Sequence, residues 1–167
     1  MQETRASDLL QRLGLVSAVA ASVAIVDLLT KSIAEELLSR NGSVLITPFL
    51  NLRLGYNTGI SFGLLRATSG SAVIAMIAVQ SLIVMGLVLL AVRNSARLER
   101  LALALILGGA LGNIVDRFQD GAVTDFLDVH LSGWHWPTFN VADIAITCGA
   151  VLLILVSLRL SQQASGI

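Results

Sequence analysis

The chain has 167 residues, of which 55% are hydrophobic and only 13% are charged, and its mean hydropathy is +0.82. This composition is typical of an integral membrane protein and exceeds the apolar content of ordinary globular domains. The net charge is zero and no run of Lys or Arg is present. The sequence therefore excludes nucleic acid as a partner, because a basic surface is needed to bind phosphates.

The first apolar segment follows a short polar tail at residues 1–12 and extends over about residues 13–34. A basic start before an apolar stretch is also found in cleaved signal peptides, but no convincing small-residue cleavage site follows here. We therefore expect a retained membrane-spanning helix. Asp27 and Lys31 are four residues apart on this helix and can form an ion pair on one of its faces.

A β-strand is predicted after the turn at Asn41 and Gly42. Between residues 50 and 57 apolar and polar residues alternate, which is the period of a half-buried strand. An open strand cannot span a bilayer, so we expect it at the membrane surface, with residues 44–47 as its hairpin partner. Asn57 and Gly59 follow, and the glycine allows the backbone to turn and to approach another chain closely.

Three more apolar segments predict membrane-spanning helices at about residues 72–92, 101–116 and 141–160. The first of these is long enough to cross a hydrocarbon core of about 30 Å. The connections are short, and we find neither an internal repeat nor a domain boundary. The sequence thus predicts a single membrane domain over residues 1–167.

Four spans place both termini on the same side of the membrane. Six arginines then share that side, at positions 5, 12, 93, 97, 100 and 159, against five basic residues in the opposite connections. By the positive-inside rule the side with the termini is cytoplasmic, which puts the strand and the third connection at the outer face. Trp134 and Trp136 suit an aromatic belt at that interface.

Carboxylates are concentrated in the run from residue 108 to residue 143, between the third and fourth spans. The five acids of this run are Asp116, Asp120, Asp125, Asp128 and Asp143. An acid at the mouth of a bilayer helix is costly unless it is paired, hydrated or used, so each one is a candidate functional residue. Two close carboxylates divide the roles of proton donor and base. Spacing alone does not identify the pair.

Helical spacing groups Asn113, Asp116 and Arg117 on one side of the third span. These residues can serve chemistry directly, or Asp116 and Arg117 can simply cap a packing helix. The same stretch has three residues without side chains, which would let another helix approach closely: Gly108, Gly109 and Gly112.

The fourth span begins near Asn140 and Asp143, which are three residues apart. Asn140 is well suited to be the N-cap, and Asp143 would then lie in the first turn, where the helix dipole favours an acid and where it can face the bundle. Asp143 could also serve only the helix terminus.

The acids and two nearby histidines, His130 and His135, match no calcium-loop or zinc template, so we predict neither a metal nor another cofactor. The single cysteine, Cys148, cannot form an internal disulfide and is predicted to be a small core residue.

Five motifs in order resemble the lipoprotein signal peptidases (type II signal peptidases) of bacteria, over nearly the whole chain. They are DLLTK at 27–31, NTG at 57–59 with Phe62, GGALGNIVDR at 108–117, VTDF at 123–126 and FNVAD at 139–143. The sequence departs from the family pattern at Leu28, where Gln is common, and at Thr124, where a second Val is usual. Neither departure changes a carboxylate.

The resemblance implies an all-α membrane protein with four transmembrane helices and a small extracytoplasmic β-sheet cradle. It implies an aspartic endopeptidase that removes signal peptides from diacylglyceryl-modified prolipoproteins by cutting before the lipidated cysteine, with Asp125 and Asp143 as the catalytic pair. Residues expected to bind substrate or support the site are Asp27, Lys31, Asn57, Gly59, Asn113, Arg117 and Asn140. Asp116 is then structural.

The resemblance further implies a monomer in the bacterial cytoplasmic (inner) membrane, with prolipoproteins and membrane lipid as partners, and inhibition by the cyclic peptide globomycin. Two other functions are consistent with the residues: a small transporter or ion-binding protein, and a purely structural membrane subunit. Transporters usually have repeats and acids near the bilayer midplane, whereas here the acids crowd one end of the spans.

Overall fold

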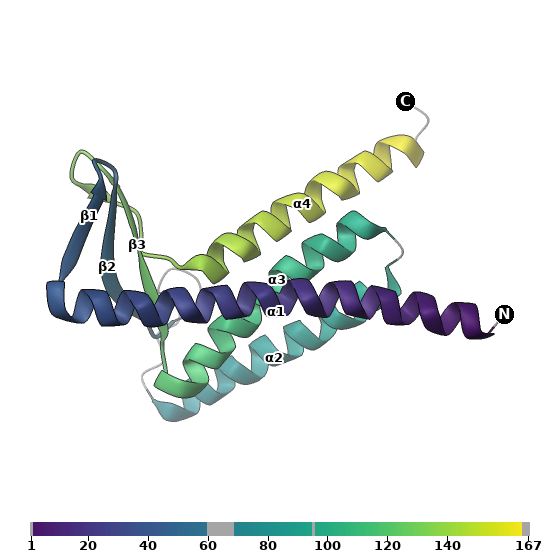
Figure 1. Ribbon diagram of the computed structural model, residues 1–167, viewed down its shortest axis with the longest axis horizontal. Coiled ribbons are helices and arrows are strands. Elements are labelled where there is room, and N and C mark those ends of the chain that lie inside the picture. Colours follow the sequence, from purple (N-terminus) through teal and green to yellow (C-terminus); the bar gives the residue numbers. More distant parts are fainter. Residues whose placement is uncertain (1, 60–68, 95, 165–167) are drawn as a thin grey trace.

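The computed structural model describes residues 2–59, 69–94 and 96–164, which form four long helices and a small sheet (Figure 1). The helices are α1 (Gln2–Asn41), α2 (Gly70–Arg93), α3 (Arg97–Asp120) and α4 (Val141–Ala164). Each is long and apolar enough to cross a membrane. The helices continue past the apolar segments expected from the sequence, because polar residues outside a bilayer can remain helical and carry no hydropathy signal.

Helix α3 is the centre of the bundle and packs against α1, α2 and α4. In its apolar stretch 44% of the residues are buried, against 6% to 17% in the other three helices. The predicted close packing at its glycines is confirmed. A Cβ added to Gly108 would lie 2.6 Å from the carbonyl oxygen of Ala20 on α1, so a larger residue there would separate the two helices.

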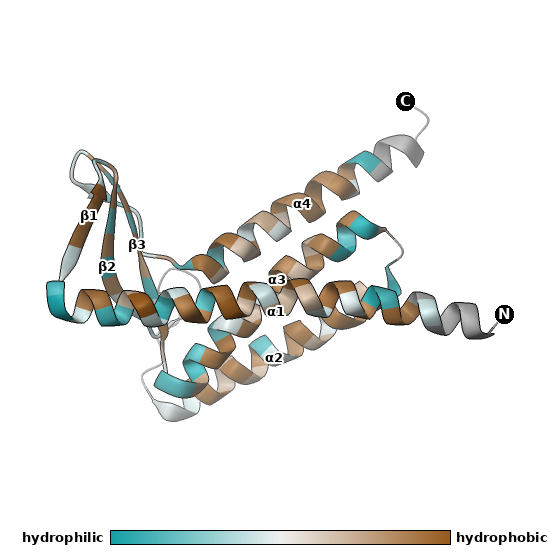
Figure 2. Ribbon diagram, viewed as in Figure 1, coloured by the Kyte–Doolittle hydropathy of each residue, from teal (hydrophilic) through white to brown (hydrophobic). Residues whose placement is uncertain are grey.

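The outer surface of the helices is apolar, as Figure 2 shows by the brown stretches along their middle. Large hydrophobic side chains are exposed there, among them Leu29 on α1, Leu82 on α2 and Ile154 on α4. Cys148 is also exposed, so the prediction that it is a core residue was wrong. In a membrane-spanning helix an apolar residue gives no signal of burial, because lipid and protein interior are both apolar.

The sheet is antiparallel, with its strands in the order β1 (Ser43–Thr47), β2 (Leu50–Asn57), β3 (Val123–Leu131) and β4 (Trp134–His135). The predicted hairpin of the first two strands is confirmed, with Val44 opposite Leu52. The sheet stands at the end of the bundle opposite both chain termini (Figure 1). Phe126 of β3 packs with Ala34 and Leu38 of α1, which attaches the sheet to the first helix.

The connection between α3 and α4 contains two strands that the sequence analysis did not predict, β3 and β4. The two strands are joined by Ser132 and Gly133, which both have positive φ, at 50° and 83°. Two such residues are typical of a two-residue hairpin, and the Ser-Gly dipeptide is the signal of this turn in the sequence. The alternation in β3 was obscured because polar residues lie on both of its faces, Asp125 on one and Asp128 on the other.

Candidate active site

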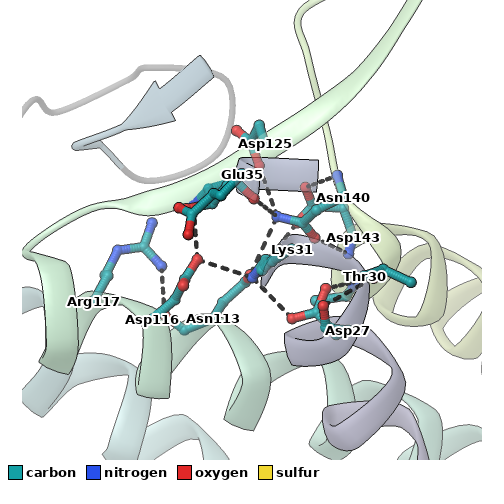
Figure 3. Close-up of polar contacts among 12 residues, drawn as sticks. Asp27, Thr30, Lys31, Glu35, Asn113, Asp116, Arg117, Asp125, Asn140 and Asp143 are labelled. Carbon is teal, nitrogen blue, oxygen red and sulfur yellow. Dashed lines mark hydrogen bonds and ion pairs between the residues drawn. The ribbon is translucent and has the colours of Figure 1, made fainter. Parts of the chain in front are cut away.

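Lys31 lies at the centre of a buried polar cluster where α1, α3, β3 and the start of α4 meet (Figure 3). Its Nζ lies 2.8 Å from Oδ2 of Asp27, 3.1 Å from Oδ2 of Asp116 and 2.9 Å from Oδ1 of Asn113. Three acceptors match the three N–H donors of an ammonium group. The predicted pair of Asp27 and Lys31 is therefore present, but as part of a larger network that joins two helices.

The two acids that neutralise Lys31 also accept hydrogen bonds from backbone N–H groups of neighbouring elements. Oδ1 of Asp27 accepts a hydrogen bond of 2.8 Å from the N–H of Ala142, in the first turn of α4. Oδ2 of Asp116 accepts one of 2.6 Å from the N–H of Thr124. Because Thr124 directly precedes Asp125 and Ala142 directly precedes Asp143, the cluster places the backbone of both candidate catalytic acids.

Asn140 connects the two candidate acids. Its Nδ2 donates to Oδ1 of Asp125 at 2.7 Å, and its Oδ1 accepts from the N–H of Asp143 at 3.0 Å. The N–H of Asn140 in turn donates to Oδ2 of Asp143 at 3.3 Å, which completes a reciprocal cap at the start of α4. Asn113 adds a further donor, from Nδ2 to Oδ1 of Asp143, at 3.2 Å. The two predicted roles of Asp143 are thus compatible, because its carboxylate both caps the helix terminus and faces the bundle.

The environment of Asp125 favours its protonated form. Burial raises the pKa of Asp125, the charge of Asp143 raises it further, and hydrogen bonds from Asn140 and Asn57 and the charge of Lys31 lower it, with a net result of about 7. A carboxylic acid with this pKa can hold a proton near neutral pH and can donate it.

The turn after β2 is held against the site by Arg117. Nη2 of Arg117 donates to the carbonyl oxygen of Gly59 at 2.6 Å, and Oδ1 of Asn57 accepts from the N–H of Gly59 at 2.9 Å. Arg117 thus connects the third helix to the sheet and is not simply the partner of Asp116 in a helix cap. Phe62, named among the motifs, lies outside the described residues.

Two acids of the carboxylate-rich run do not join the site. Asp120 is exposed at the end of α3. Asp128 is buried on the opposite face of β3, where it contacts Nδ1 of His135 at 2.8 Å and Nε of Arg53 at 3.7 Å. Among the described residues no group of three or more His, Cys, Asp or Glu side chains is arranged to hold a metal ion.

Glu35 and Thr124 were not among the predicted site residues. Oγ1 of Thr124 donates to Oε1 of Glu35 at 2.8 Å, and Thr124 is only 1% exposed. Glu35 follows Lys31 by four residues and therefore lies on the same face of α1, which is the only signal that could have pointed to it. The bond adds another contact between α1 and the strand residue before Asp125.

Comparisons with known proteins agree with the resemblance seen in the motifs. A family model described as signal peptidase (SPase) II matches residues 19–159. The chain is 45% identical over 141 residues to a lipoprotein signal peptidase of Francisella tularensis subsp. novicida (strain U112), covering 83% of this chain and 88% of the relative. A lipoprotein signal peptidase of Coxiella burnetii (strain Dugway 5J108-111) is 44% identical over 135 residues, covering 80% and 83%.

The fold also resembles solved structures. One described as a bacterial membrane enzyme matches with a TM-score of 0.76 at 31% sequence identity, over 88% of this chain and 94% of that chain. A second structure with the same description matches with the same TM-score at 29% identity, over 88% and 89%. The fold of this chain is thus similar to the folds of both solved structures.

Proposed function

The chain belongs to the signal peptidase II family, and from this membership we propose how its residues carry out the reaction. The protein is a peptidase that removes signal peptides from prolipoproteins, and it is a multi-pass protein of the bacterial inner membrane. A transporter is not favoured, because the relatives in several bacteria are lipoprotein signal peptidases.

In our proposal the peptidase is aspartic, with Asp125 as the acid and Asp143 as the base. The observation that carries the proposal is the bridge formed by Asn140, which contacts Asp125 at 2.7 Å and Asp143 at 3.0 Å. Burial and the neighbouring charge raise the pKa of Asp125 to about 7. Asp143 receives N–H donors from Asn113 and Asn140, which suit an ionised carboxylate.

The reaction begins when Asp143 takes a proton from water and the water oxygen bonds to the carbonyl carbon of the scissile peptide. Asp125 donates its proton to the carbonyl oxygen, so that no free oxyanion forms. The C–N bond then breaks as Asp143 returns its proton to the amine nitrogen, and the hydroxyl proton of the intermediate returns to Asp125. Both carboxyl groups end in their starting states, and no cofactor takes part.

The substrate is a prolipoprotein with a diacylglyceryl-modified cysteine, cut directly before that cysteine. Asn57 is the last residue of β2 and donates a hydrogen bond to Asp125, and Gly59 follows in the turn held by Arg117. Both residues can hold the substrate backbone. The pairing of β1 with β2 ends at Ser43 opposite Arg53, so the last part of β2 extends beyond its first neighbour. An extended substrate segment added along this edge would lie one strand away from Asp125, because Gly55 of β2 is paired with Asp125 of β3.

We place both termini in the cytoplasm and the site at the outer face. The sheet and the carboxylates lie at one end of the bundle, and both termini at the other (Figure 1). The end with the termini also holds Arg93, Arg97 and Arg100 at the connection of α2 and α3. An excess of arginine on that side fits the positive-inside rule. We propose that the protein acts as a monomer.

The test is a gel-shift cleavage assay with purified protein in detergent and a diacylglyceryl-modified prolipoprotein. We expect Asp125→Asn and Asp143→Asn each to lower kcat/KM by about 100- to 10,000-fold, since each removes one proton-transfer group. A chelator should leave wild-type cleavage unchanged. Circular dichroism and the detergent elution profile serve as controls that both variants are folded.

Each result bears on one part of the proposal. Near-normal turnover by either folded variant would contradict the catalytic pair, and loss of cleavage with chelator would point to a metal-dependent reaction. No cleavage by folded wild type would contradict the peptidase function itself.

A further inference from the structure

Thr138 lies beside Asp125, although the mechanism above does not use it. A Cβ built on Gly55 would lie 2.6 Å from Oγ1 of Thr138, so this hydroxyl occupies the space of a side chain at position 55. Gly55 is paired with Asp125 across the sheet. Paired residues point to the same face and their Cβ atoms are about 5 Å apart, which places Oγ1 of Thr138 on the face of Asp125 and within about 8 Å of its Cβ.

The extended segment before α4 directs Thr138 toward the catalytic acids. Phe139 exchanges two backbone hydrogen bonds with Leu127 of β3, at 3.1 and 2.9 Å. Because successive side chains of an extended backbone alternate, Thr138 and Asn140 project to the same side. Asn140 is the residue that contacts Asp125 (Figure 3). Thr138 therefore reaches the site from the same segment as Asn140.

The hydroxyl of Thr138 is available to a ligand. Within residues 2–59, 69–94 and 96–164, no hydrogen bond joins it to another protein group, and the residue is partly exposed. Thr124 is different, since it is 1% exposed and donates its hydroxyl proton to Glu35. A threonine hydroxyl can donate one hydrogen bond and accept two.

The position of this hydroxyl suits a peptide backbone. The pairing of β1 with β2 ends at Arg53, so β2 has an open edge at Gly55. A substrate segment that passes from this edge to Asp125 crosses Gly55, where the hydroxyl of Thr138 lies. An extended peptide carries an N–H and a C=O group about every 3.3 Å, and each needs a partner when it leaves water.

We propose that Thr138 is a substrate-binding residue, whose hydroxyl forms a hydrogen bond with a backbone group of the prolipoprotein within about two residues of the scissile bond. The inference rests on the proposed function and extends it by naming a contact to the peptide part of the substrate. Thr138 acts on binding, and the proton transfers of Asp125 and Asp143 proceed without it.

Thr138→Val tests the contact, because valine keeps the branched shape and lacks the hydroxyl. In the cleavage assay with lipid-modified substrate we expect KM to rise about tenfold, as for one lost hydrogen bond, and kcat to stay near the wild-type value. Thr138→Ser keeps the hydroxyl and should restore most of the wild-type KM. An unchanged KM in Thr138→Val would overturn the proposal.

Thr47→Val is the matched control, since it makes the same chemical change in the same sheet. Thr47 is paired with Leu50, and Leu50 with Val129, four residues along β3 from Asp125. This variant should keep the wild-type KM and kcat. An equal rise of KM in both variants would contradict a specific contact of Thr138.

The pH profile separates substrate binding from a disturbed catalytic pair. The pKa of Asp125 is raised to about 7 by burial and by the charge of Asp143, and the falling limb of the profile should report it. In Thr138→Val this limb should keep its wild-type position. A displaced limb would show that the hydroxyl acts through Asp125, and this result would overturn the assignment.

Gly55→Ala tests the placement of the hydroxyl independently. The added methyl group would meet Oγ1 of Thr138 and should lower kcat/KM. The same change should have a much smaller effect in a Thr138→Ala protein, where that oxygen is absent. Equal effects in the two backgrounds would contradict the placement.

A binding measurement keeps the contact separate from the peptidase function. In the Asp125→Asn protein, which should bind substrate without turnover, Thr138→Val should weaken binding of the lipid-modified prolipoprotein about tenfold. Equal affinity with and without the hydroxyl would contradict the contact. No cleavage by folded wild type would instead contradict the peptidase proposal, and the binding measurement then still reports on Thr138.

Discussion

Nδ2 of Asn140 lies 2.7 Å from Oδ1 of Asp125, although the two residues come from different elements and are 15 positions apart. The same asparagine caps α4 by accepting from the N–H of Asp143 at 3.0 Å. One side chain therefore uses its acceptor for helix stability and its donor for the candidate catalytic acid. These two roles can be separated by substitution.

Asn140→Ser keeps an oxygen that can cap the helix but removes the amide donor to Asp125. We expect this variant to melt within a few degrees of wild type and to lose at least tenfold in kcat/KM. Asn140→Ala removes both groups and should also lose about 1 kcal/mol of stability, the usual cost of an absent cap. Thermal melts and initial cleavage rates measure both effects. Wild-type turnover by Asn140→Ser would show that the donor is dispensable.

The pH dependence of cleavage should follow the proton on Asp125. Its pKa is raised to about 7 by burial and by the charge of Asp143, and the proposed reaction needs this proton. We therefore expect kcat/KM to fall as pH rises above about 7, by up to tenfold per pH unit. A pH–rate profile from pH 5 to 9 with the lipid-modified substrate measures it. A profile that keeps rising to pH 9 would contradict Asp125 as the acid.

The raised pKa of Asp125 also predicts that the folded protein becomes less stable as the pH rises. A folded-state pKa above the usual 3.8 means that the folded protein binds the proton more tightly, so its stability decreases as pH rises from about 4 to about 7. Asp125→Asn removes this penalty, which is at most about 4 kcal/mol. The difference in Tm between Asp125→Asn and wild type should hence be larger at pH 8 than at pH 5.

Lys31 should contribute strongly to the stability of the folded protein, in contrast to the exposed Arg40 on the same helix. Lys31→Met leaves the buried carboxylates of Asp27 and Asp116 without their cation, and breaking such a buried pair costs about 3–5 kcal/mol. The matched control is Arg40→Met, because Arg40 pairs with Glu36 at 3.7 Å where both side chains are exposed. Exposed pairs contribute little, so thermal melts should separate the two variants clearly. Equal Tm values would refute the role of the cluster.

Gly112 should not tolerate a side chain. A Cβ at this position would lie 2.5 Å from Oδ2 of Asp27, which is fixed by Lys31 and Ala142. We expect Gly112→Ala to lower Tm and to reduce cleavage. Gly86→Ala on α2 is the control, because a Cβ there meets nothing within 4 Å. This change should be neutral or stabilising by about 1 kcal/mol, the difference in helix propensity.

Asp128 should stabilise the sheet in a pH-dependent way. Burial alone would raise its pKa, but hydrogen bonds from His135 and Asn51 and the charge of Arg53 outweigh burial and hold the pKa below the usual 3.8. The stabilisation is therefore present above about pH 4 and is lost as pH falls through the folded-state pKa. Asp128→Asn should lower Tm at pH 7 and have a smaller effect at pH 3. Asp120→Asn, at an exposed position, should have no effect at either pH.

The local pattern of apolar and polar residues was sufficient to predict much of the fold. Apolar stretches of sufficient length predicted the four helices, because every lipid-facing residue must be apolar and backbone hydrogen bonds must close within the helix. Alternation at residues 50–57 predicted β2, since a half-buried strand has a period of two. The same reasoning missed β3, where Asp125 and Asp128 put acids on both faces, and it assigned Cys148 to the core although it faces outward.

By itself, the sequence determined the membrane class, the four spans and the set of polar residues from which a site can be built, because charged groups in apolar segments are rare and therefore conspicuous. Only the tertiary structure decided which of them meet. It brought Asp125 and Asp143 to Asn140, gathered Asp27, Asp116 and Asn113 around Lys31, and left Asp120 and Asp128 apart. The physical reason is that spacing along one helix or strand fixes only which face a residue occupies. Distances between elements depend on how closely they pack, and here glycines set that packing.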